Sequence, residues 1–166
     1  MIVLAVLLVP VLGILGATAI YGMRKYVTAA KTVEAKNGVT AIARFAVAAY
    51  ERDHRLCASA EPVPSSVPRG VKYAPSTAAG ADFHAGDATK GWPCLKFSME
   101  APMYYQYAYE TGAGSGKSGA TASGFEASAR GDLDGNGVTS FFARGGDVRD
   151  GHVVLRPDLY IENEME

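Results

Sequence analysis

Three side chains that carry oxygen stand at alternate positions in the run Asp132-Leu133-Asp134-Gly135-Asn136-Gly137. Carboxylate and amide oxygens at this spacing, with a glycine at the sharp turn, open the calcium loop of EF-hand sites. The twelfth position of such a loop is Ala143, so the bidentate glutamate is missing. Asp-Gly and Asn-Gly pairs also favour tight hairpin turns without a metal. We therefore predict that Asp132, Asp134 and Asn136 shape a turn, with weak calcium binding as the alternative.

A glycine-rich run, Gly-Ala-Gly-Ser-Gly-Lys-Ser-Gly at 112–119, resembles a phosphate-binding loop. Thr111 stands where the first glycine of that motif belongs, and no buried strand precedes it, so we predict a flexible hairpin loop. No Ser/His/Asp or Cys/His group and no pair of carboxylates indicates catalysis, and we predict that the protein is not an enzyme. The net charge of -1 gives no electrostatic reason to bind nucleic acid.

The two cysteines are Cys57 and Cys94. In an exported domain of this size such a pair usually forms one disulfide, which would tie the chain between them to its surroundings. A zinc site would need more ligands than these cysteines and the scattered His54, His84 and His152 supply. The sequence therefore predicts a Cys57–Cys94 disulfide and no cofactor beyond the possible weak calcium.

The elements that hold these residues begin with an apolar run, because the first charged residue of the chain is Arg24. About 20 apolar helical residues match the hydrocarbon thickness of a bilayer, so residues 1–23 are predicted to form a retained transmembrane or packing helix. A cleavable signal peptide is the alternative, but nothing basic precedes Ile2. Pro10 is expected to kink or locally open this helix. Gly13, Gly16 and Gly22 would let neighbouring helices approach closely.

The helical pattern continues from residue 24 to residue 55, where the chain has no proline and a single glycine, Gly38. Apolar residues recur there at spacings of three and four, which indicates an amphipathic helix with one buried face. The predicted stripe consists of Val27, Ala30, Val39, Ile42, Phe45, Ala46 and Ala49. Residues 1–55 should then form one helix of about 50 residues, about 75–80 Å long.

Residues 56–166 are predicted to form a globular head. The segment 58–91 is rich in proline, serine, alanine and glycine, and indicates a long loop with a short strand at 71–73. Strand-like segments follow within 101–156, at 103–109, 125–130, 138–143 and 152–155, before a C-terminal tail. The predicted fold class is α+β, with an antiparallel meander packed on the amphipathic half of the long helix.

The first 50 residues resemble the N-terminal helix of type IV pilins and type II secretion pseudopilins. The resemblance lies in the apolar start MIVLAV, the segment LGILGATAIYGMRKYV and the run Thr32-Val33-Glu34-Ala35-Lys36. Family members also carry a glutamate near the N-terminus that neutralises the terminal amine of a neighbouring subunit, whereas Glu34 is the first glutamate here. Either the numbered chain begins downstream of the mature end, or the subunit enters a filament by shape and hydrophobic contact alone.

The resemblance implies a structural subunit with a pilin-like fold. It would be held in the bacterial inner membrane, then moved by pilus assembly machinery into an extracellular helical filament of identical subunits. A type II secretion pseudopilin, or a single-pass membrane-anchored envelope domain that does not polymerise, are the alternatives. A short basic leader ending in glycine upstream would favour the pilin. The residues expected to pack in the filament core are Val6, Leu8, Pro10, Leu12, Gly13, Leu15, Gly16 and Ile20.

Overall fold

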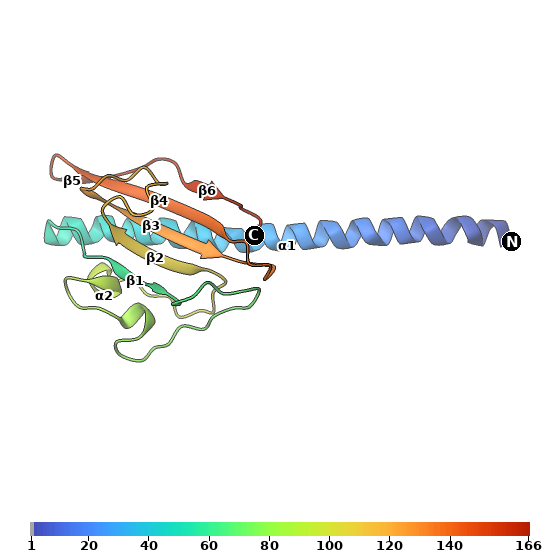
Figure 1. Ribbon diagram of the computed structural model, residues 1–166, viewed down its shortest axis with the longest axis horizontal. Coiled ribbons are helices and arrows are strands. Elements are labelled where there is room, and N and C mark those ends of the chain that lie inside the picture. Colours follow the sequence, from blue (N-terminus) through green and yellow to red (C-terminus); the bar gives the residue numbers. More distant parts are fainter. Residues whose placement is uncertain (1) are drawn as a thin grey trace.

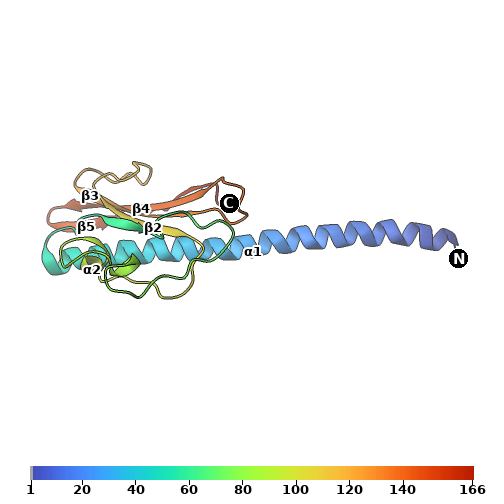
Figure 2. The ribbon, with the colours of Figure 1, turned by 60° about the horizontal axis from the view of Figure 1, so that its bottom comes forward.

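The computed structural model describes the backbone of residues 2–166; side chains are described from residue 25 onward and at residues 22 and 23, and Gly13 is described as well. One helix, α1 (Ile2–Asp53), extends along the whole molecule (Figure 1). Its second half lies against a six-stranded sheet whose pairings are all antiparallel, and its first half stands clear of the head (Figures 1 and 2). The predicted α+β class and the long N-terminal helix are confirmed.

The course of α1 differs from the prediction at two points. The helix continues through Pro10 without interruption, so the predicted local opening there is not found. A proline removes only one hydrogen bond from the ladder of so long a helix. The helix ends at Asp53 rather than at residue 55, because His54 adopts a left-handed conformation with φ 52° and donates its N–H to the Tyr50 carbonyl at 2.7 Å.

The sheet contains the predicted meander, in which consecutive strands are neighbours, and one further strand on each side of it. Its order is β1-β2-β3-β4-β5, and β6 pairs with β4 beyond the stretch that β5 occupies. The strands are β1 (Ala60–Val63), β2 (Gln106–Thr111), β3 (Gly124–Gly131), β4 (Ser140–Arg149), β5 (His152–Leu155) and β6 (Tyr160–Glu162).

Three expectations about the head are wrong in detail. The segment 71–73 is not a strand, because only Tyr73 pairs, in a single bridge with Met103. The segment 58–91 is not one loop, since it holds β1 and the short 3-10 helix η1 (Asp82–His84), and the helix α2 (Gly91–Leu95) begins at its end. Strand β4 runs to residue 149 rather than 143. It passes through two buried glycines, and because glycine has a weak strand propensity the sequence did not predict this part of the strand.

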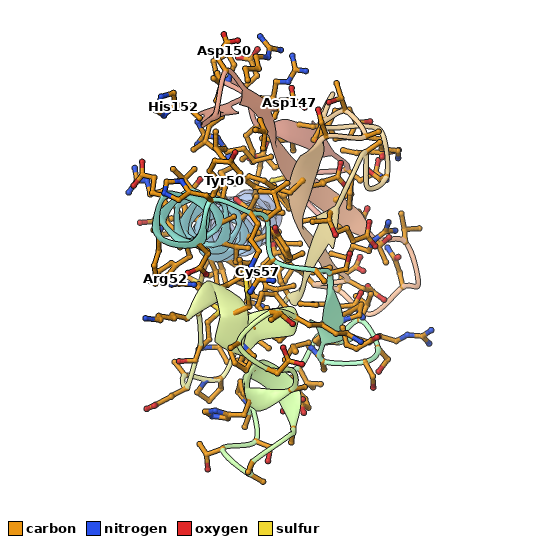
Figure 3. The ribbon with its side chains drawn as sticks, turned by 90° about the vertical axis from the view of Figure 1, so that its left-hand side faces the viewer. Tyr50, Arg52, Cys57, Asp147, Asp150 and His152 are labelled. Carbon is orange, nitrogen blue, oxygen red and sulfur yellow. A yellow bond between two sulfur atoms is a disulfide. The ribbon has the colours of Figure 1, made fainter. Side chains whose placement is uncertain are left out.

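The core lies between α1 and the sheet, as the view along α1 from its C-terminal end shows (Figure 3). The helix contributes mainly small residues, and the sheet side contributes large aromatic ones. Val27 and Ala30 of the predicted stripe are exposed, because the described core begins only farther along α1, and Phe45 is 41% exposed at its margin. The fully buried positions of α1 are Ala35, Val39, Ile42 and Ala43, with Ala46 and Ala49 almost so.

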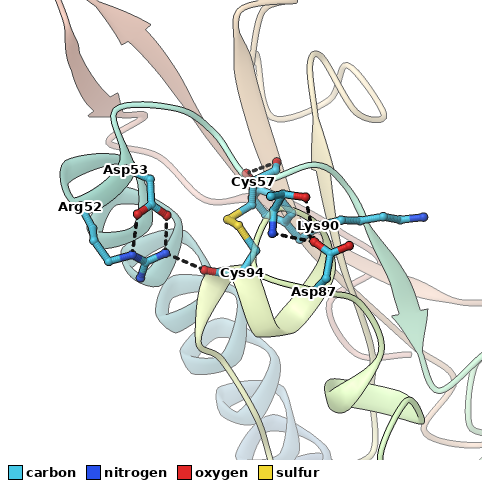
Figure 4. Close-up of a disulfide and its surroundings, with 8 residues drawn as sticks. Arg52, Asp53, Cys57, Asp87, Lys90 and Cys94 are labelled. Atoms are coloured by element: carbon cyan, nitrogen blue, oxygen red, sulfur yellow. Dashed lines mark hydrogen bonds and ion pairs between the residues drawn. A yellow bond between two sulfur atoms is a disulfide. The ribbon is translucent and has the colours of Figure 1, made fainter.

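The predicted disulfide between Cys57 and Cys94 is present, with the two Cα atoms 5.9 Å apart. It joins the segment after α1 to α2 (Figure 4). Arg52 of α1 reinforces the junction by donating to the Cys94 carbonyl at 2.9 Å while it pairs with Asp53. An aromatic cluster of Phe83, Trp92 and Phe97 fills the space beside this junction.

Candidate functional site

The acidic run at 132–137 forms the turn that the sequence predicts. It connects β3 to β4, and its exposed side chains bond to the backbone of the turn itself. Asp134 Oδ1 accepts the N–H of Asn136 at 3.0 Å, and Asn136 Oδ1 accepts the N–H of Val138 at 2.6 Å. These oxygens therefore stabilise the turn directly, as the turn interpretation requires.

Asp132 differs from the other two residues of the motif because it is buried. Its side chain is 1% exposed, Oδ2 accepts the N–H of Gly137 at 3.0 Å, and Oδ1 has no partner among the described residues. With Ser66, Arg69 and Thr139 it lines a cavity of about 470 Å³. In the part of the chain that the structure describes, no three His, Cys, Asp or Glu side chains stand close enough to hold a metal ion. Calcium binding at Asp132, Asp134 and Asn136 thus stays an untested prediction.

The glycine-rich run at 112–119 is the loop between β2 and β3, and its backbone N–H groups already bind an anion of the protein. The buried Glu126 side chain accepts the N–H of Ser115 at 3.0 Å and the N–H of Ser118 at 3.2 Å. Because both carboxylate oxygens of Glu126 occupy these donors, the loop is a structural cap on the sheet rather than a phosphate site.

Two of the three histidines, His54 and His152, line the same cleft, and His84 lies elsewhere. His54 directly follows α1 and lines a cleft with Glu51 and with His152 of β5. His152 is labelled in the view along α1 from its C-terminal end (Figure 3). His84 stands apart in η1. These side chains do not converge as metal ligands among the described residues.

The part of α1 outside the head, and the first turn within it, expose apolar side chains. Met23 is 70% exposed, Tyr26 77%, Val27 46% and Val33 50%. Of the predicted filament-core residues, Gly13 is exposed, with no heavy atom within 4 Å of where a Cβ would stand. The side chains of Val6, Leu8, Pro10, Leu12, Leu15 and Ile20, and residue Gly16, lie outside the described set. Among the described residues, no helix is long and apolar enough to cross a membrane.

A cleft of about 320 Å³ lies where α1 leaves the head. We call it the neck cleft, and it is lined by Tyr26, Lys31 and Glu34 of α1 together with Lys72 and Tyr104 of the head. The Lys31 Nζ stands 4.3 Å from the centre of the Tyr104 ring, and the Lys72 Nζ stands 5.0 Å from it. Two cations from distant parts of the chain therefore share one aromatic ring.

Glu34 connects the neck cleft to β2 and to the residues just before it by hydrogen bonds. Its Oε1 accepts the N–H of Tyr104 at 2.8 Å, and its carbonyl accepts the Tyr107 hydroxyl at 3.2 Å. Burial raises the pKa of the Glu34 carboxyl above its ordinary value, although the Tyr104 hydrogen bond and the charge of Lys72 oppose this rise. The sequence did not indicate this cleft, because Lys72 and Tyr104 lie in two separate segments, 71–73 and 103–109, that the sequence predicts as strands.

Comparison with protein-family models, with curated proteins and with solved structures finds no match to this chain.

Proposed function

We propose that the protein is a structural subunit that polymerises through α1 into a type IV pilus-like filament, after being held in the inner membrane. One observation carries this proposal. The second half of α1 belongs to the core of the head, whereas the first half extends beyond it, with exposed apolar side chains at Met23 and Tyr26 (Figure 1). A helix that is apolar on all sides needs other apolar groups around it, from lipid or from further helices.

Repetition of such a helix favours a polymer. Burial of apolar surface contributes about 25 cal/mol per Å², so contacts with several neighbouring helices would hold a filament without covalent links. A head-to-tail contact that does not close on itself produces an open helical filament instead of a ring. Pilus assembly machinery would supply the transfer of the subunit out of the membrane.

The alternatives share the same architecture. A type II secretion pseudopilin would use the same helix to pack against other subunits, and a membrane-anchored binding domain would use it only to stay in the bilayer. No described feature of the head favours a second function over the filament. Polymerisation itself is therefore the property to test.

The test is to replace Leu12 or Leu15 with aspartate in the full chain and to examine filaments by electron microscopy. We expect filaments to be lost, because an unpaired charge would be buried between apolar helices. Asn37→Asp is the matched control, since it adds the same charge at an exposed position of α1. Circular dichroism should find the head folded in all three variants.

The results separate the alternatives. Normal filaments from the Leu12→Asp and Leu15→Asp variants would contradict a filament core formed by the apolar helix. A wild-type protein that remains monomeric in the membrane fraction under every assembly condition would favour the anchored domain instead.

A further inference from the structure

We infer that the neck cleft binds the phosphate groups of anionic lipids while the subunit is in the membrane. This inference rests on the membrane-held stage of the proposed function, and adds to it a lipid partner and a set of residues. Its lining begins at Tyr26, just after the apolar run of α1.

The first support is the charge of the cleft. Neither Lys31 nor Lys72 belongs to any ion pair found among the described side chains. Each ammonium group has three N–H donors, and a contact with the Tyr104 ring does not use all of them. The remaining donors of both groups can serve the oxygens of one phosphate, which are strong acceptors of charge-assisted hydrogen bonds.

The one carboxylate in the cleft, Glu34, balances only one of the two lysine charges. Glu34 directs Oε1 to the backbone N–H of Tyr104, at 2.8 Å, and its side chain is partly buried. The exposed Lys25 adds a further positive charge directly before Tyr26, which lines the cleft. Lys25, Lys31 and Lys72 therefore outnumber the one carboxylate of the neck cleft, although the whole chain carries a net charge of -1.

The second support is the position of the cleft along the chain. The apolar run of residues 1–23 ends one residue before the first charge, Arg24, and Tyr26 is 77% exposed immediately after it. Exposed tyrosines and lysines at the end of an apolar helix are typical of the boundary between hydrocarbon and headgroups. A lysine close to an anionic membrane surface contributes about 1 kcal/mol to binding.

The geometry favours a lipid over free phosphate. Two lysines without a nest of backbone N–H groups make a weak site for an ion in solution. A headgroup beside an inserted helix is already at high effective concentration, so a weak contact suffices. On leaving the membrane the subunit would lose this contact.

The experiment uses the full chain in vesicles of phosphatidylcholine alone, or of phosphatidylcholine with about 30% phosphatidylglycerol, and measures amide hydrogen exchange. We expect exchange at residues 25–34, 71–73 and 103–105 to be at least about threefold slower with phosphatidylglycerol. High salt should remove the difference, because screening shortens the Debye length to about 3 Å at 1 M. The variant Lys31→Gln/Lys72→Gln should show no difference between the two vesicles.

The matched control is Arg55→Gln/Lys90→Gln, which removes two exposed positive charges elsewhere on the head. It should behave as the wild type does. Lys72→Gln alone, in a surface segment, serves if the double variant unfolds, and should lose at least half of the difference. Equal exchange in both vesicles, or an unchanged difference in the lysine variants, would overturn the inference. Slowing by inorganic phosphate alone, in detergent without lipid, would overturn the lipid assignment.

Filament formation is scored separately by electron microscopy of the same proteins. Filaments without a lipid-dependent difference would reject the lipid contact and leave the proposed function standing. A lipid-dependent difference in a protein that never forms filaments would reject polymerisation and leave the lipid contact standing.

Discussion

Asp132, Asp134 and Asn136 have the spacing of a calcium loop, but the three side chains differ in their exposure to solvent. All three accept backbone N–H groups of the turn, but Asp132 alone is buried, and it lines a cavity with Arg69 and Ser66. The spacing alone predicts a turn here. It does not reveal that Asp132 is buried, because that depends on the segment 64–70, which is distant in sequence and pairs with Asp132 through Arg69.

We predict that calcium hardly changes the melting temperature of residues 25–166. Ligand at a hundredfold excess over its Kd would add about 2.7 kcal/mol of stability, which is a shift of several degrees for a domain of this size. The measurement is a thermal melt in millimolar calcium and in chelator, repeated with Asp134→Ala. A rise of several degrees that Asp134→Ala removes would show that the motif binds calcium after all.

Gly38 provides a second prediction at the residue scale. A Cβ at this position would stand 2.7 Å from Cζ and 2.8 Å from the hydroxyl oxygen of Tyr107, a fully buried ring. Gly→Ala in a helix normally gains about 1 kcal/mol, but overpacking of a rigid core costs about 1–3 kcal/mol. We expect Gly38→Ala to lower the free energy of unfolding by about 1–2 kcal/mol, measured by urea denaturation.

The adjacent Asn37→Ala is the control for helix propensity, because Asn37 is exposed. It should raise the free energy of unfolding by a few tenths of a kcal/mol. If Gly38→Ala raises the urea midpoint as much as Asn37→Ala does, the close contact between α1 and Tyr107 is not part of the folded protein.

At the scale of elements, the sequence predicted the long helix, the disulfide and the meander, because periodicity, cysteine number and turn residues are local signals. It missed β1, whose residues include Pro62. A proline cannot donate to a strand ladder, but β1 ends the order of the sheet, and an edge strand tolerates a missing donor. It also missed β6, a strand of three residues whose pairing with β4 is a tertiary contact.

The disulfide supports a prediction about the part of the head that has little regular structure. Replacement of both Cys57 and Cys94 by serine should lower the free energy of unfolding by about 2–4 kcal/mol, since the closed loop is long. Hydrogen exchange should accelerate around Trp92 and Phe97, and change little in β3, which pairs on both edges. Exposed Ser98→Ala is the control, and uniform acceleration throughout the sheet would contradict a local role for the bridge.

At the scale of the whole molecule, α1 belongs to two environments. From Thr32 onward it supplies buried residues to the head, and before that point the described side chains are exposed or only partly covered. The sequence predicted a division at Arg24, whereas the described buried residues begin only at Thr32. It could not predict the neck cleft, because Lys31 and Lys72 come from distant parts of the chain and approach each other only over the Tyr104 ring of the folded protein.

This division predicts that the head folds without the first 24 residues. None of the buried residues of the described chain precedes Thr32, so a chain of residues 25–166 loses no described core contact. Its melting temperature and near-ultraviolet circular dichroism should match those of the head in the full chain, while filaments and membrane association disappear.

Truncation to residues 40–166 is the contrasting variant, because it removes Ala35 and Val39 from the core. Loss of two buried apolar side chains and of the helical turns that carry them should cost at least about 3–5 kcal/mol. If the 25–166 chain melts as low as the 40–166 chain, the head depends on the free half of α1, and the proposed separation between a folded head and an assembly helix does not hold.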